Sequence, residues 1–249
     1  MQPRRRKIIV DELHLTLLEH LGELRWRLLR AAVAVLAGTI AGSFITTPVI
    51  KMLVQPLGEG QIVTLSPTEA PLAYFRVALF LGVLLALPYV LYQLYAFAAP
   101  GLRSHERALL LVGFPAVLLL FTLGALFTMT VLVPISLPLL MAFLQDVVQP
   151  VYSLERYLAF VTTLLLWMGL LFQTPLVLYA AARLGLVKPD ALRRARKMVI
   201  FLAALAAAII TPTTDPITML LVTGPFVALY EVGLLLARLA ARQRAAFSA

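Results

Sequence analysis

The sequence has no cysteine and few charged residues. Of its 249 residues, 13% are charged and 61% are hydrophobic, and the mean hydropathy is +0.94. The lack of cysteine excludes disulfides, thiolate nucleophiles and zinc sites with cysteine ligands. A soluble domain typically carries about 25% charged residues, so this chain has too few to cover a surface that faces water. We therefore expect an integral membrane protein, and a single polytopic domain over residues 1–249, because apolar runs fill nearly the whole chain.

Motifs of enzymes and cofactor sites are also missing. The chain has no His-Glu-x-x-His, Gly-x-Ser-x-Gly, P-loop or dinucleotide-binding fingerprint. Its three histidines are His14, His20 and His105, and none has a partner at metal-ligand spacing inside an apolar run. We therefore expect a protein that is not an enzyme, with no catalytic residues, no metal and no cofactor.

Six apolar stretches predict six transmembrane helices, which makes the fold class all-α. A helix needs about 20 residues to cross a hydrocarbon core of about 30 Å. The stretches lie near residues 31–46, 71–99, 107–134, 155–184, 197–211 and 216–237. The last two helices are expected to be short, so the bilayer thins around their hairpin or the hairpin is re-entrant.

The basic residues lie almost entirely on one side of this topology. The net charge is +9, from 21 Lys and Arg against 12 Asp and Glu. All but three of the basic residues fall in the two termini or in the second and fourth loops, and the exceptions are Lys51, Arg76 and Arg156. Because basic residues stay on the cytoplasmic side, the terminal segments 1–30 and 238–249 are both predicted to be cytoplasmic. The positive charge thus indicates orientation, and we expect no nucleic acid partner.

Acidic residues form a stripe on the segment that precedes the first span. Between residues 11 and 30 the leucines recur at helical spacing, and Glu12, Glu19 and Glu23 share a different stripe of the same helix. The stripe is either the solvated face of an amphipathic interfacial helix or a site for a cationic ligand such as a guanidinium group. Glu106 lies on the same side of the membrane, where it can interact with a helix dipole or share that site.

A few polar residues interrupt or flank the spans. Gln173 lies in the middle of the fourth span, where it must find a partner, and both packing within this protein and docking of a foreign helix remain open. Asp215 is placed as the N-cap of the last helix, and Glu231 is expected to pair internally or to reach the interface. Ser66 and Glu69 predict a capping box at the start of the second span.

Four motifs occur in order along the chain. They are His20-Leu21-Gly22-Glu23-Leu24-Arg25-x-Arg27-Leu28, Ser66-Pro67-Thr68-Glu69-Ala70, the run Tyr92-Gln93-x-Tyr95-Ala96-Phe97-x-Ala99-Pro100-Gly101-Leu102 with His105-Glu106-Arg107, and Thr211-Pro212 with Asp215. Over nearly the whole chain they resemble the TatC family, the polytopic receptor of the twin-arginine protein translocase.

The resemblance implies a concave, glove-like bundle of six helices in a bacterial or archaeal plasma membrane. It implies that the protein binds twin-arginine signal peptides of folded cargo at the cytoplasmic face. Its implied partners are TatA-like single-span membrane proteins, with or without TatB-like ones, in an oligomeric complex surrounded by lipid. Export is then driven by the proton motive force.

The resemblance also implies roles for particular residues in signal-peptide binding. Glu23 and Glu106 match the acidic residues that receive the arginine pair of the peptide. Arg25, Phe97 and Arg107 match the surface around them.

Other matched residues concern the outer loop, the cavity and the partner subunits. Pro56 matches a proline of the first outer loop, and Gln173 and Asp215 match positions tied to the concave cavity and to partner engagement. The family often has glutamate where this chain has Gln173, and frequently glutamine where it has Met219. The resemblance therefore implies an uncharged hydrogen-bond partner at 173 in place of a full charge, and partner contacts near 219 that differ from those of the family.

Two other classes fit the composition less well. A transporter of ions or small solutes would need paired ionisable residues near the midplane or repeated broken helices; this chain offers only Gln173 and no evident internal repeat. An intramembrane enzyme would need a nucleophile beside a base inside the spans, and the sequence has no such pair.

Overall fold

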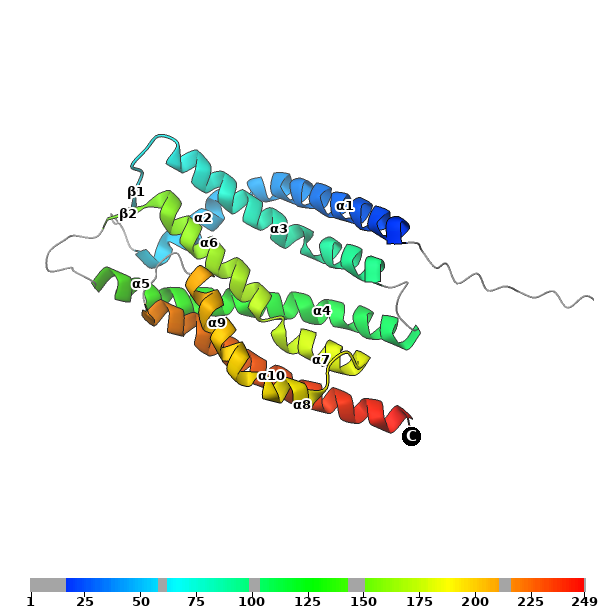
Figure 1. The fold of residues 1–249 in the computed structure, drawn as a ribbon. Coiled ribbons are helices and arrows are strands. Elements are labelled where there is room, and N and C mark those ends of the chain that lie inside the picture. The colour runs from blue at the N-terminus through cyan, green and yellow to red at the C-terminus, as the bar shows by residue number, and fades with distance from the viewer. Residues whose placement is uncertain (1–16, 58–61, 99–103, 143–150, 211–215, 249) are drawn as a thin grey trace, which may run out of the picture.

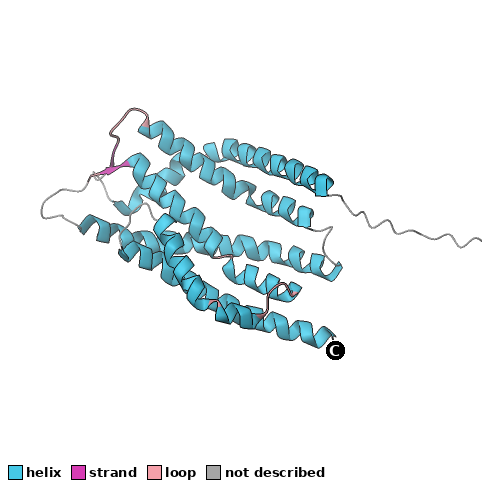
Figure 2. Ribbon diagram, in the orientation of Figure 1, coloured by secondary structure: helices cyan, strands magenta, loops and turns pink. Residues whose placement is uncertain are grey.

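The described chain is an almost entirely helical bundle (Figures 1 and 2). The computed structural model describes residues 17–57, 62–98, 104–142, 151–210 and 216–248. In chain order the elements are α1 (Leu17–Ser43), α2 (Thr46–Val54), the 3-10 turn η1 (Gln55–Leu57), β1 (Ile62–Val63), α3 (Glu69–Ala98), α4 (Ser104–Phe127), the π turn η3 (Thr128–Leu132), α5 (Val133–Ala142), β2 (Tyr152–Ser153), α6 (Leu154–Leu171), α7 (Thr174–Leu184), α8 (Pro189–Arg194), α9 (Arg196–Ile210) and α10 (Pro216–Ser248).

Four helical segments in the described ranges are long and apolar enough to cross a membrane. They are Glu69–Phe97, Gly113–Ala142, Leu154–Leu184 and Pro216–Gln243. A fifth is the pair Gly22–Ser43 and Thr46–Leu57, which is bent by 75°. Helix α9 has 15 residues, about 22 Å at 1.5 Å per residue, and is shorter than a full span. The prediction of a helical membrane protein is thus confirmed, with α9 as short as the sequence suggested. The expectation that the last helix is short as well was wrong, because α10 has 33 residues and its segment Pro216–Gln243 is long enough to span a membrane.

The third long helix continues beyond its expected end near residue 134 and stops at Ala142. Pro134 suggests an end there, because a proline lacks an N–H group and clashes with the carbonyl four residues earlier. The structure has a π turn directly before it, in which the N–H of Val133 donates to the carbonyl of Thr128. The wider turn changes the hydrogen-bond pattern at the proline and lets the helix continue.

Helix α6 forms the centre of the bundle, where it packs against α3 and α4. Its fully buried side chains recur at steps of three and four, which places them along one side of the helix: Leu158, Val161, Leu164 and Met168. Near its start, the hydroxyl of Tyr157 donates to the carbonyl of Leu53 at 2.7 Å. This bond ties α6 to the end of α2, beside the short parallel pairing of β1 with β2.

Helices α1 and α3 touch through their backbones. A Cβ atom on Gly82 would lie 2.6 Å from the backbone nitrogen of Thr39, and one on Gly38 would lie 2.6 Å from the carbonyl oxygen of Gly82. Small residues at such crossings allow close van der Waals packing, which is a main source of helix association in lipid. The two glycines therefore fix how α1 lies along α3.

The capping box predicted before α3 forms with shifted partners. The helix begins at Glu69, and the Glu69 carboxylate accepts the backbone N–H of Leu65 at 3.0 Å. The hydroxyl of Ser66 accepts the N–H of Thr68 at 3.3 Å. The capping side chains are those that the sequence indicated, but Glu69 accepts the N–H of the residue before Ser66, the predicted N-cap, and not that of Ser66 itself.

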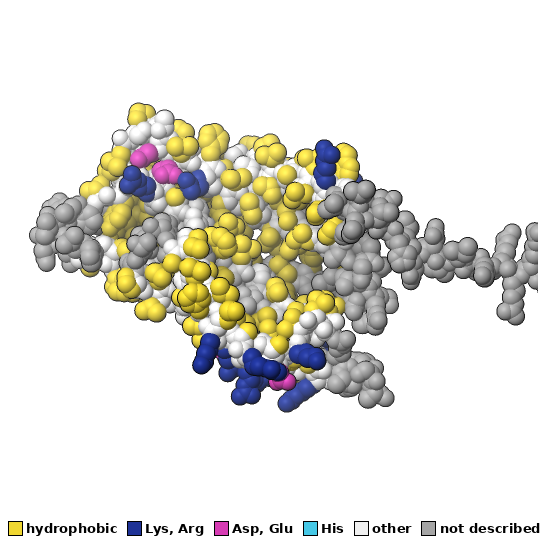
Figure 3. All heavy atoms as spheres, in the orientation of Figure 1, with side chains coloured by type: hydrophobic (Ala, Val, Ile, Leu, Met, Phe, Trp, Pro, Cys, Tyr) yellow, Lys and Arg dark blue, Asp and Glu magenta, His cyan; other side chains and the backbone are white. Residues whose placement is uncertain are grey.

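The two ends of the bundle differ in the elements that they carry. The start of α1, the end of α3, the start of α4 and the C-terminus lie together at one end, and β1 and β2 lie at the other (Figure 1). Near β2, Arg76 of α3 pairs with Glu155 of α6 at 2.6 Å. In Figure 3, hydrophobic side chains cover much of the visible surface between the ends.

Candidate functional site

The candidate site lies at the end of the bundle that holds the start of α1. There, α1 runs beside the C-terminal part of α3, and α4 begins nearby (Figure 1). These are the helix ends on which the sequence placed Glu23, Phe97 and Glu106. The close backbone contact between α1 and α3 sets the position of the first two relative to each other.

Glu23 of α1 is held by an arginine one turn further along the same helix. The Nε of Arg27 donates to the Oε1 of Glu23 at 2.8 Å, and its Nη2 donates to the same oxygen. The side chains of Arg27 and Glu23 are only 20% and 23% exposed, so the pair is shielded from water more than most surface ion pairs. The guanidinium group therefore fixes the carboxylate in one place on α1.

The pair is also tied to α3. The Nη1 of Arg27 donates to the Oε1 of Gln93 at 3.4 Å, and Gln93 is buried, with 4% exposure. A buried amide in an apolar helix needs a partner, and Arg27 supplies one from the neighbouring helix. Glu23, Arg27 and Gln93 thus form one polar network across the contact between α1 and α3.

An open hollow lies in front of this network. It has a volume of about 440 Å³ and is lined by Glu23, Trp26, Arg27 and Arg30. A second hollow of about 390 Å³ shares Trp26 and Arg30 and continues along α1 to Ala37. Among the residues that the structure describes, the lining contains one carboxylate and two guanidinium groups, so this described part of the hollow is not acidic. A second carboxylate is needed before its charge favours a cation.

The remaining peptide-site residues do not all face this hollow. Arg25 is exposed on α1. It lies two residues after Glu23, which corresponds to about 200° of rotation around the helix. Arg25 therefore does not line the hollow with Glu23. Phe97 lies half-buried near the end of α3. Glu106 and Arg107 belong to the first turn of α4, and their side chains lie outside the described residues. The structure therefore brings the helices together and places Arg25 on another face.

Gln173 lies at the break between α6 and α7. Its Nε2 donates to the carbonyl of Val117 on α4 at 3.0 Å and to that of Gly169 at 3.2 Å. Its Oε1 is buried and has no hydrogen-bond partner among the described residues. The donor half of the amide thus packs helices within this protein, while the acceptor half remains unsatisfied.

The other sequence-based candidates are spread over the molecule. Pro56 is exposed in the turn η1 that follows the bent first span, and Asp215 lies outside the described residues. Met219 lies in the first turn of α10. Glu231 of α10 forms an ion pair with Arg196 of α9, as expected from the cost of an unpaired charge at that depth. Within the described ranges, no group of three or more metal-ligating side chains occurs.

Sequence reasoning missed two members of the site, Gln93 and Trp26. Gln93 is a lone amide in an apolar helix, and the rule that such a group needs a partner would have singled it out, but not identified Arg27 as the partner. Trp26 is 63% exposed, and an exposed tryptophan next to arginines at a helix end is typical of a membrane interface.

Comparison with known proteins identifies relatives over most of the chain. The sequence model of the family "Sec-independent protein translocase protein (TatC)" matches residues 19–225. The TatC protein of Aquifex aeolicus is 35% identical over 92% of this chain and 97% of its own length. TatCy of Bacillus subtilis is 36% identical over 92% of this chain and 91% of its own length. A crystal structure of a twin arginine translocase receptor TatC superposes with a TM-score of 0.80 at 35% identity, covering 89% of this chain and 99% of that one.

Proposed function

Because the chain belongs to the TatC family of Sec-independent protein translocase components, we propose that it is the signal-peptide receptor and scaffold of a twin-arginine translocase. It binds twin-arginine signal peptides of folded proteins at the cytoplasmic face of a bacterial or archaeal plasma membrane. TatA-like single-span proteins, with or without TatB-like ones, join it in an oligomeric complex, and the proton motive force drives export. In this topology α9 is the fifth of six spans, and both termini are cytoplasmic.

The observation that supports this function best is that the guanidinium group of Arg27 is hydrogen-bonded to the carboxylate of Glu23. Arg27 donates two hydrogen bonds to one carboxylate oxygen in a partly shielded hollow. Charge-assisted bonds between guanidinium and carboxylate are stronger than neutral ones and favour arginine over lysine. An arginine of the peptide therefore finds a carboxylate that is already oriented for a guanidinium group, and it binds by taking over the place of Arg27.

The second arginine of the peptide requires Glu106. The described lining of the hollow carries more positive than negative charge, so a peptide with two arginines would be repelled without another carboxylate. Glu106 stands in the first turn of α4, at the same end of the bundle. Phe97 and Arg107 then form the border of the site, and Arg25, on another face of α1, contacts a part of the peptide beyond the arginine pair.

The partner proteins use a different part of the molecule. The buried Oε1 of Gln173 accepts no hydrogen bond from the described residues, and a donor on a partner helix reaches it when docking opens the break between α6 and α7. An uncharged amide can fill that role without the full charge that glutamate would bring. Asp215 and Pro56 belong to the outer side of the same assembly, where they contact partner subunits.

Crosslinking tests the peptide site. A twin-arginine signal peptide with a photoreactive group is expected to crosslink to the membrane-inserted wild-type chain. Glu23→Ala combined with Glu106→Ala should abolish crosslinking and leave the protein in the membrane. Glu155→Ala is the matched control, because it removes a carboxylate at the opposite end of the bundle. Undiminished crosslinking in the double variant would refute the assignment of the site.

A further inference from the structure

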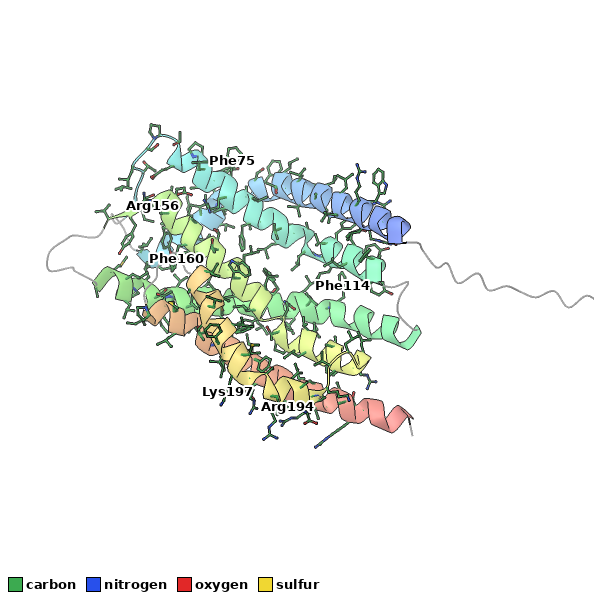
Figure 4. All side chains as sticks on the ribbon, in the orientation of Figure 1. Phe75, Phe114, Arg156, Phe160, Arg194 and Lys197 are labelled. Atoms are coloured by element: carbon green, nitrogen blue, oxygen red, sulfur yellow. The ribbon has the colours of Figure 1, made fainter. Side chains whose placement is uncertain are left out.

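The corner between α7 and α9 carries a cluster of exposed cations, which we name the basic corner. Its members are Lys188, Arg193, Arg194 and Lys197, and all four are exposed. None of them forms an ion pair with any side chain in the described part of the chain. The dark blue group along the lower edge of Figure 3 shows this accumulation of positive charge, and Figure 4 shows Arg194 and Lys197 projecting away from the bundle.

The helical turns of the corner are anchored, so the cations stand on a fixed platform. Gly185 ends α7 in the left-handed conformation, with φ of 76°, and Pro189 begins α8. Leu192 then packs against a cluster of alanines formed by Ala182, Ala237 and Ala240. The hydroxyl of Tyr230 donates to the carbonyl of Leu192 at 2.7 Å. Because Leu192 faces inward, the neighbouring Arg193 and Arg194 face outward.

Internal pairing does not neutralise the basic corner. Arg196, the adjacent arginine, is used by Glu231 in an ion pair between α9 and α10. The carboxylate nearest in sequence is Asp190, which is also exposed. Four cations and this one carboxylate leave a net charge of +3 on a short stretch of surface. Such a concentration favours an anionic partner.

Exposed apolar side chains flank the cations. Leu186, before the corner, is 74% exposed, and Met198, directly after Lys197, is 64% exposed. Phe201, one turn further along α9, is 66% exposed. Cations beside apolar side chains that continue into an apolar helix match the layered chemistry of a lipid, with its phosphate above and its acyl chains below. A soluble acidic protein would leave this apolar edge uncovered.

We propose that the basic corner is a binding site for anionic phospholipids. The phosphate and any further anionic group of the headgroup lie among Arg193, Arg194 and Lys197, and the acyl chains lie along the exposed side of α9. The site is separate from the peptide site on α1, and the proposal does not depend on signal-peptide recognition. An anionic lipid is then a ligand with a defined site at this corner, in addition to the bulk lipid that surrounds the spans.

Native mass spectrometry of the full chain, purified in detergent with added lipid, tests the proposal. Phosphatidylglycerol should remain bound more strongly than phosphatidylcholine of the same acyl chains. Each cation near an anionic surface strengthens binding by about fivefold, so Arg194→Gln with Lys197→Gln should weaken retention of phosphatidylglycerol by about 10- to 30-fold. Retention of phosphatidylcholine should not change.

The matched control removes two cations from the other end of the bundle. Lys51 and Arg156 are also exposed, and Lys51→Gln with Arg156→Gln should leave retention of phosphatidylglycerol within about twofold of wild type. Equal losses in the two double variants, or no loss in either, would overturn the proposal. So would displacement of the lipid by an equal concentration of glycerol phosphate, because the site would then recognise a free phosphate.

Discussion

Replacing Gly82 with alanine should separate the two helices that build the candidate site. The new Cβ would lie 2.1 Å from the Oγ1 of Thr39, 2.6 Å from its backbone nitrogen and 2.7 Å from its Cα. Ordinary van der Waals contact begins near 3.4 Å, so α1 and α3 must move apart by about 0.8 Å at this crossing, as expected for an overpacked interface. A backbone cannot rotate away as a flexible side chain can, so both helices have to shift.

The expected cost follows from this clash. Overpacking of a tight interface typically costs about 1–3 kcal/mol, and contact with a backbone places Gly82→Ala toward the upper end of that range. For a chain of this size, each kcal/mol lowers the unfolding temperature by about 2–4 °C. The shift should also loosen the bond between Arg27 and Gln93, which is already long at 3.4 Å, and so weaken binding of a signal peptide.

Thermal unfolding of the detergent-solubilised protein measures this effect. Gly113→Ala in α4 is the matched control, because a Cβ there would meet nothing within 4 Å. The control should leave the unfolding temperature unchanged or raise it, since alanine favours a helix over glycine by about 1 kcal/mol. Equal unfolding temperatures for the two variants would refute the argument that α1 and α3 are held by backbone contact.

Three further substitutions test other parts of the structure. Gln173→Leu removes both hydrogen bonds that the amide donates at the break between α6 and α7, and it should lower the free energy of unfolding by about 1 kcal/mol. The unfolding temperature should fall accordingly, and an unchanged temperature would contradict the packing role of Gln173. Glu231→Gln should cost less than about 1 kcal/mol, because its ion pair with Arg196 is more than a third exposed, and a larger loss would show a stronger coupling of α9 to α10. Arg27→Gln removes the internal guanidinium from Glu23 and should tighten binding of a twin-arginine peptide severalfold, whereas weaker binding would show that Arg27 contacts the peptide itself.

The helices could be predicted from the sequence because lipid allows few alternatives. Each apolar run must satisfy its own backbone hydrogen bonds, so it becomes a helix where it crosses the membrane. The span predicted to end near residue 134 continues as a helix to Ala142, because the π turn at Thr128 accommodates Pro134. Helix α2, which follows the bend after Ser43, was also not predicted, since the expected first span ended near residue 46.

The site was only partly readable from the sequence. The acidic stripe identified Glu23, and the spacing of four residues allowed Arg27 to offset its charge. Gln93 could not be connected to them, because the contact between α1 and α3 depends on a crossing that Gly38 and Gly82 set far from the polar groups. The spacing of two residues already places Arg25 about 200° from Glu23 around a helix, and it was the family resemblance that grouped the two residues in one site.

The central claim is that a carboxylate in this hollow recognises guanidinium groups. The most direct measurement is the dissociation constant of a twin-arginine signal peptide and of its twin-lysine counterpart, for the wild-type chain and for Glu23→Gln. Lysine has the same charge but lacks the planar fork that pairs with a carboxylate. We expect the wild type to prefer the arginine peptide by about tenfold or more, as one lost charge-assisted pair would give, and the variant to lose most of that preference. An arginine preference that is unchanged in Glu23→Gln would contradict the account.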